Sequence, residues 1–191
     1  TSYLRFKVQE DLKFVVIVGS LRRGSFNAAI ADTLPELVSE KVIVERMASL
    51  DTFPHYSADI EEEGIPQAVA GMADAIISAD GVIIITPEYN HSMPGVLKNA
   101  LDWLSRVAPQ PLANKPVLVQ SSSVGKLGGV RAQAHLRQVL GYFDVRLLNK
   151  PEAIIGEISE KVTNGILTDE STRQFLIRQL VAFEKFVRAA P

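Results

Sequence analysis

The sequence predicts an α/β protein with an open parallel sheet and helices on both of its faces. Three observations support this fold class: short unbroken runs of apolar residues, amphipathic stretches between them, and Gly, Ser and Thr clusters directly after the runs. Unbroken apolar runs rich in β-branched residues are typical of parallel strands that are covered on both faces. Their regular alternation with helical stretches is typical of doubly wound sheets.

Five strands are expected. The clearest are residues 14–18, 82–85 and 117–119, because each is an apolar run that ends in small or hydroxyl-bearing residues. Residues 42–47 and 145–148 are shorter candidates. Five strands joined by helices point to the flavodoxin-like order 2-1-3-4-5.

Five helices are expected between and after these strands. They cover residues 27–40, 66–79, 95–107, 129–142 and 169–189. Pro35 should mark a bend or an early end of the first helix, and Asp169 is a candidate cap for the last. The dense charge run at 59–63 is interpreted as a solvated loop, with metal binding as the weaker alternative.

The length and composition limit the possible functions. A chain of 191 residues suits one domain, expected over 13–191, with 1–12 as an N-terminal extension or remnant. The net charge of −2 gives no general attraction to nucleic acid, and no apolar run approaches a membrane span. Cysteine is absent, which fits a cytoplasmic location, and the three histidines lack metal-ligand spacing, so no metal is expected.

The loop after the first strand has the character of a phosphate site. Residues 19–27, G-S-L-R-R-G-S-F-N, place glycines, hydroxyls and two arginines at the start of a helix, where backbone N–H groups favour an anion. Ser25 stands where a P-loop requires lysine, and Leu21 replaces the second glycine of the dinucleotide fingerprint. A mononucleotide phosphate is therefore favoured, and a solvated loop with incidental hydroxyls is the alternative.

Two further loops should reach the same edge, because doubly wound sheets bind ligands at the carboxyl ends of their strands. Residues 86–95, T-P-E-Y-N-H-S-M-P-G, offer an aromatic ring and an amide to a flat heteroaromatic ligand. Residues 121–129, S-S-S-V-G-K-L-G-G, allow close backbone approach. Taken alone, the first could be a structural turn and the second a flexible surface loop.

Together these motifs closely resemble the NADPH-dependent FMN reductase family, and within it the bacterial NAD(P)H:quinone reductases, also called chromate reductases. The resemblance also includes L-K-N-A-L-D-W-L-S-R at 97–106 and K-P-V-L-V-Q-S-S-S-V-G-K-L-G-G at 115–129. It runs from about residue 14 to at least residue 151. It implies a flavodoxin-like subunit that binds FMN without a covalent link and takes electrons from NADPH or NADH.

The resemblance implies roles for particular residues. FMN would contact Gly19, Ser20, Leu21, Arg22, Ser25, Phe26, Asn27, Pro87, Glu88, Tyr89, Asn90, Ser122, Ser123 and Gly125. Substrate would contact Arg106, His91 and Lys126, with Arg106 supplied by a neighbouring chain of a homodimer or homotetramer. His91 departs from the Tyr or Phe often expected there, which bears on substrate preference.

The expected function is that of an FMN-dependent NAD(P)H oxidoreductase. It would reduce quinones, and chromate or other oxidants, by ping-pong hydride transfer through flavin N5 with no catalytic side chain. The alternatives are an NAD(P)H-dependent FMN or azo reductase and a flavodoxin-type electron carrier. Apolar residues in the expected helix at 95–107, namely Leu97, Leu101, Trp103 and Leu104, predict a subunit interface, unless Trp103 belongs to the core.

Overall fold

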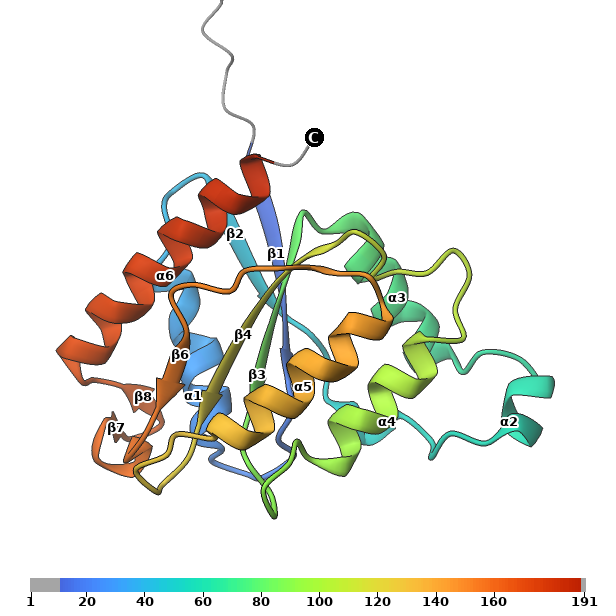
Figure 1. Ribbon diagram of the computed structural model, residues 1–191, viewed down its shortest axis with the longest axis horizontal. Helices are drawn as coiled ribbons and strands as arrows, with labels where there is room; N and C mark the ends of the chain where they lie inside the picture. Colours follow the sequence, from blue (N-terminus) through green and yellow to red (C-terminus); the bar gives the residue numbers. More distant parts are fainter. Residues whose placement is uncertain (1–10, 190–191) are drawn as a thin grey trace, which may run out of the picture.

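A parallel sheet forms the centre of the molecule in the computed structural model, which describes residues 11–189 (Figure 1). The main strands are β1 (Leu12–Val18), β2 (Val42–Arg46), β3 (Gly81–Thr86), β4 (Pro116–Ser122) and β5 (Arg146–Leu147). They pair in the order β2-β1-β3-β4-β5, so the predicted fold class and strand order are confirmed. Most of the expected extension at 1–12 lies outside the described residues, and β1 already begins at Leu12.

The fifth position of the sheet is shared by two short strands. β5 pairs with the first residues of β4, whereas β6 (Ala153–Ile155) pairs with Gln120, Ser121 and Ser122 at the end of β4. β6 was not predicted, because three residues carry too little pattern. The ladder with β6 also extends β4 through Ser122, so the first two serines of the predicted third loop are buried strand residues.

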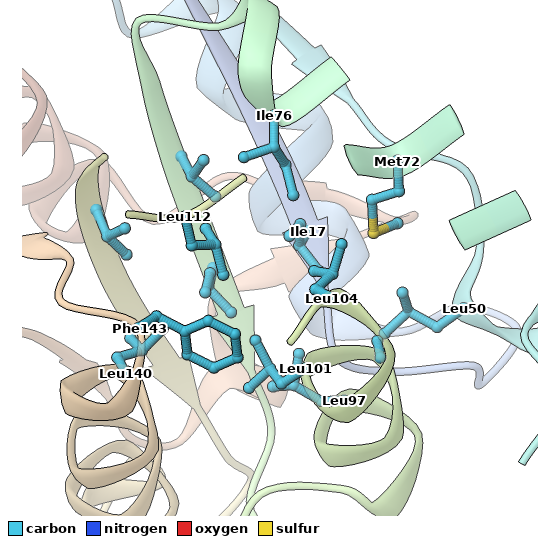
Figure 2. Packing of buried hydrophobic residues seen from close by; sticks show 14 of the residues in the cluster. Ile17, Leu50, Met72, Ile76, Leu97, Leu101, Leu104, Leu112, Leu140 and Phe143 are labelled. Carbon is cyan, nitrogen blue, oxygen red and sulfur yellow. The ribbon is translucent and has the colours of Figure 1, made fainter. Parts of the chain in front are cut away.

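Helices cover both faces of the sheet. α1 (Phe26–Thr33) and α6 (Glu170–Arg188) pack on one face, and α3 (Gln67–Ser78), α4 (Gly95–Leu104) and α5 (Val130–Tyr142) pack on the other (Figure 1). Side chains alternate between the two cores, since Phe14 and Val16 join the first while Val15 and Ile17 join the second. Figure 2 shows Ile17 within the second core, among residues of the 3₁₀ turn Leu50–Thr52, α3 and α4.

The local features agree only in part with the predictions. α1 ends at Thr33 and not at residue 40, and the early end expected at Pro35 is confirmed, because Pro35 lies in a 3₁₀ turn (Leu34–Glu36). The charge run at 59–63 was interpreted as a loop, but α2 (Ala58–Glu62) forms there because the Ser57 hydroxyl accepts from the Asp59 N–H group. A hairpin of β7 (Val162–Thr163) and β8 (Ile166–Leu167), preceded by a 3₁₀ turn (Ile158–Glu160), was not predicted.

The apolar residues of α4 belong to the core of the subunit. Leu97, Leu101, Trp103 and Leu104 are each at most 1% exposed. Trp103 donates from its indole nitrogen to the Pro54 carbonyl at 2.8 Å, and its ring meets Tyr56 edge-on at 5.1 Å. The inference of a subunit interface from these residues was therefore wrong, because residues 50–60 cover this side of the helix.

A buried chain of amides joins α6 to the sheet edge that carries β6. Gln120 of β4 donates to Gln179 of α6 at 2.9 Å, and Gln179 donates to the Pro151 carbonyl at 2.8 Å. Both glutamines are fully buried. The chain fixes the segment leading into β6 and thereby the wall of the cleft described next.

Candidate active site

A cleft opens at the carboxyl edge of the sheet, where the strand order switches between β1 and β3. Its volume is about 290 Å³, and it is lined by Ser20, Arg22, Ser25, Phe26, Asn27, Pro87, Glu88, Tyr89, Ser122, Ser123, Val124 and Ile158. All of these except Val124 and Ile158 were predicted as cofactor contacts. Residues from all three predicted loops therefore meet at one site.

The loop between β1 and α1 is held in a fixed turn. The Ser25 hydroxyl caps α1 by accepting from the Ala28 N–H group at 3.3 Å. Arg22 donates to the Gly24 carbonyl at 2.7 Å, and its guanidinium lies 4.9 Å from the Phe26 ring centre. N–H groups in the first turn of a helix have no partner within that helix. The loop thus gathers backbone donors and a positive charge where an anion would bind.

A buried hydrogen bond ties the third loop to the first. The Ser122 hydroxyl, at the end of β4, donates to the Asn27 amide oxygen at 3.1 Å. Both residues are less than 5% exposed. The bond uses the amide oxygen of Asn27, and both residues line the cleft. The two side chains therefore close the floor of the cleft.

A tight hairpin turn holds Tyr89 at the mouth of the cleft. The backbones of Tyr89 and Ser92 exchange two hydrogen bonds of 2.9 and 3.0 Å, while Asn90 and His91 have φ of 50° and 67°. Two positive φ angles in a two-residue turn define type I′. Asn90 and His91 lie exposed at the tip, outside the residues that line the cleft. The Ser92 hydroxyl lies 3.1 Å from His135 of α5 and anchors the turn.

Glu88 lines the cleft but directs its carboxylate to α5. One carboxylate oxygen accepts from the N–H groups of Arg131 and Ala132 at 3.0 and 3.1 Å. The other oxygen lies 3.6 Å from the Arg131 guanidinium. The residue at the N-cap of α5 is Gly129, which has no side chain to supply this bond. Glu88 therefore caps α5 from the neighbouring loop and locks the two loops together.

The glycines of the third loop pack it against neighbouring backbone. A methyl group at Gly129, which has φ of 83°, would lie 3.1 Å from the Ser121 Cβ atom. A methyl group on Gly156, just after β6, would lie 2.3 Å from the Lys126 carbonyl oxygen. Gly125 accepts from Ser123 and from the Glu157 N–H group at 3.1 Å, and Gly125 is not among the cleft-lining residues. The same packing places Val124 and Ile158 on the cleft wall.

The remaining predicted residues lie around or away from the cleft. Gly19 and Leu21 line an adjoining cavity of about 400 Å³ that shares Arg22 and Tyr89 with the cleft. Lys126 is exposed on the third loop and does not line the cleft.

Arg106 follows the end of α4 and is not among the residues that line the cleft. Its guanidinium lies 3.8 Å from Glu61 and 5.1 Å from the Tyr56 ring centre. Tyr56 donates a 2.7 Å hydrogen bond to the same Glu61 carboxylate, which raises the pKa of the Tyr56 phenol. Arg106 is therefore absent from the cleft of its own subunit.

The donor set of the cleft fits FMN. Ser20, Arg22 and Ser25 of the first loop line the same cleft as Pro87 and Tyr89 of the second, so hydroxyl groups, a positive charge and an aromatic ring are available to the phosphate and the ring of FMN. Within residues 11–189, no three His, Asp or Glu side chains gather as a metal site would require. None of the helices in this range is long and apolar enough to cross a membrane.

The sequence model of the NADPH-dependent FMN reductase family matches residues 12–160. The chain belongs to this family. It is 48% identical over 184 residues to a quinone reductase of Escherichia coli, covering 95% of this chain and 98% of the relative. It is 41% identical over 182 residues to an NAD(P)H-dependent FMN reductase of Pseudomonas aeruginosa, covering 95% of this chain and 98% of that one.

The solved structure of FerB, a flavoenzyme NAD(P)H:(acceptor) oxidoreductase from Paracoccus denitrificans, superimposes with a TM-score of 0.84. Its sequence is 34% identical, and the match covers 93% of this chain and 97% of that chain. The predicted family is confirmed. The predicted oxidoreductase class is confirmed with it, as are FMN as cofactor and NAD(P)H as electron donor.

Proposed function

We propose that the protein is an NAD(P)H:quinone reductase and that the cleft holds FMN where donor and acceptor can reach it. The observation that carries this proposal is the meeting of three loops at one edge of the sheet, where Ser20, Arg22 and Ser25 line the same cleft as Tyr89. The 48% identity to a quinone reductase over nearly the whole chain supports the choice of acceptor.

Different residues of the cleft would bind the phosphate and the ring of FMN. Ser20, Arg22 and the first-turn N–H groups of α1 bind the phosphate, because these groups offer donors and positive charge at one point. Pro87, Tyr89 and Ser123 border the ring. FMN held by these residues would supply the redox chemistry, which is the acceptance of a hydride from the nicotinamide and the transfer of electrons to the acceptor. The protein therefore needs to bind and orient its ligands, and no side chain has to act as acid, base or nucleophile.

The mouth of the cleft suits a flat apolar acceptor. Tyr89 and Val124, which are 50% and 66% exposed, line it, and Leu21, which is 43% exposed, lines the adjoining cavity. Exposed apolar side chains at a concave site favour ligands with little charge, such as quinones. Lys126, exposed on the third loop, and Arg106 of a neighbouring subunit would add positive charge near the mouth, which is the basis for proposing an anionic oxidant such as chromate as a further acceptor.

A single open side of the cleft leads us to expect ping-pong kinetics. Asn27 and Ser122 are buried and close the floor, so donor and acceptor must enter by the mouth. Two ring systems cannot occupy the same reacting position at about 3–3.5 Å. The oxidised nicotinamide would therefore leave before the quinone binds.

We further propose a homodimer or homotetramer, in which Arg106 reaches the cleft of a neighbouring subunit. This is supported by its distance along α4 from its own cleft and by a side chain that is 45% exposed. A cytoplasmic location is also proposed, on the absence of cysteine from the chain.

Anaerobic spectroscopy followed by steady-state kinetics tests the proposed activity. NAD(P)H should bleach the bound flavin completely, benzoquinone should restore its absorbance, and double-reciprocal plots should give parallel lines. Flavin that NAD(P)H does not bleach would identify an electron carrier. Intersecting lines would show that donor and acceptor bind together.

A further inference from the structure

A second cavity, of about 570 Å³, adjoins the proposed FMN cleft. It lies between the loop at 22–26, the outer side of α1, the end of β2 and the β7–β8 hairpin. Arg22, Ser25 and Phe26 line both spaces. The two spaces therefore adjoin at this loop, close enough for one long ligand to contact both.

The second cavity has an excess of positive charge. Its wall includes Arg22, Arg23 and Arg46 but only one carboxylate, that of Asp32. Arg46 donates to both oxygens of Asp32 at 2.9 Å, and Arg22 is bonded to the Gly24 carbonyl. The Arg23 guanidinium is exposed and has no hydrogen-bond or ion-pair partner among residues 11–189. The cavity therefore holds a cation that is free to bind an anion.

The rest of the wall suits a nucleoside. Phe26, Ala28, Ala29 and Val162 provide an apolar surface, and the Asn164–Gly165 turn of the hairpin provides polar backbone beside it. An apolar wall for a base combined with arginines for a phosphate matches a nucleoside phosphate. Arg23 and Arg46 do not line the proposed FMN cleft, so both remain for a phosphate other than that of FMN.

We propose that this cavity receives the adenosine half of NADPH and that Arg23, supported by Arg46, binds its 2′-phosphate. The inference rests on the proposed function, because the nicotinamide end of the same molecule would occupy the cleft. NADH lacks the 2′-phosphate and gains nothing from Arg23. The cavity therefore makes the protein prefer NADPH over NADH.

A binding experiment on the FMN-loaded protein tests the cavity without turnover. The probes are adenosine 2′,5′-bisphosphate and adenosine 5′-monophosphate, which differ only in the 2′-phosphate. The bisphosphate should bind about tenfold more tightly, as expected for a charge-assisted contact. Arg23→Ala should abolish this difference, and Arg23→Lys should restore part of it. Equal affinities of the unmodified protein for both probes would overturn the inference even if the enzyme reduces quinones.

Kinetics then assign the role of Arg23. Arg23→Ala should raise KM for NADPH about tenfold and leave KM for NADH and the affinity for FMN unchanged. Arg178→Ala, which removes an exposed arginine of α6 that lines neither space, should change none of the three. Equal increases with both nucleotides would refute a 2′-phosphate contact. Weaker FMN binding would place Arg23 in the flavin phosphate site and also overturn the inference.

Discussion

At the scale of single residues, the polar side chains of the motifs serve the scaffold as well as the ligand. Glu88 was expected beside the flavin, yet its carboxylate caps α5. Ser122 was expected to approach the flavin, yet it bonds Asn27 across the cleft floor. Residue types and spacing predicted which residues gather at the cleft. Their bonding partners depend on how distant loops pack, which one sequence does not reveal.

The cap formed by Glu88 can be tested through stability. Glu88→Ala leaves two N–H groups at the start of α5 without their acceptor, and should lower the free energy of unfolding by about 1 kcal/mol. Glu88→Gln keeps an acceptor oxygen and should retain most of that stability. Urea unfolding of the three proteins measures the difference. Equal stability of Glu88→Ala and the unmodified protein would contradict the capping role.

At the scale of elements, pattern length decided what the sequence could predict. Long apolar runs and amphipathic stretches correctly located β1, β3, β4 and the helices α3 to α6. β6, β7 and β8 have only two or three residues each, so their pairing partners decide whether they form. α2 depends on the Ser57 cap, whereas the sequence of this segment shows only a run of charged residues. At the split fifth position, β5 was therefore predicted from residues 145–148, whereas β6 had no clear signal.

The cap of α6 gives an element-scale prediction with a pH dependence. Asp169 accepts from the Thr172 hydroxyl and N–H group at 2.6 and 2.8 Å, and these bonds lower its pKa. Its stabilisation is complete above the ordinary aspartate pKa and is lost as pH falls through the lowered value. Asp169→Ala should cost about 1 kcal/mol near neutral pH, and less in acid. Urea unfolding of Asp169→Ala and the unmodified protein, at neutral and at acidic pH, measures the difference in their free energies of unfolding. A difference that is the same at both pH values would contradict the cap.

At the scale of the whole molecule, the order of the strands creates the site. β1 and β3 send their following helices to opposite faces, so the loops after them separate and leave a cleft. This arrangement was predictable from the alternation of elements. The oligomeric state could not be predicted in this way, because the apolar residues of α4 that suggested an interface are buried within the subunit.

The proposed assembly predicts the mass of the protein in solution. One subunit has a mass of 20.9 kDa, so a dimer or tetramer should scatter light as two or four times that value at micromolar concentration. Arg106 should become protected from solvent in the assembly, because it would reach the cleft of the neighbouring chain. A mass equal to that of one subunit would contradict both statements.

The most direct test of the account is the affinity of the flavin-free protein for FMN, measured by fluorescence titration. Ser20→Ala combined with Arg22→Ala removes a hydroxyl and a charge from the anion-binding turn while leaving the core intact. We expect FMN binding by this double variant to be weaker by about 2–4 kcal/mol, and the affinity of Arg178→Ala for FMN to be unchanged. Unchanged affinity of the folded double variant would contradict the placement of FMN in this cleft.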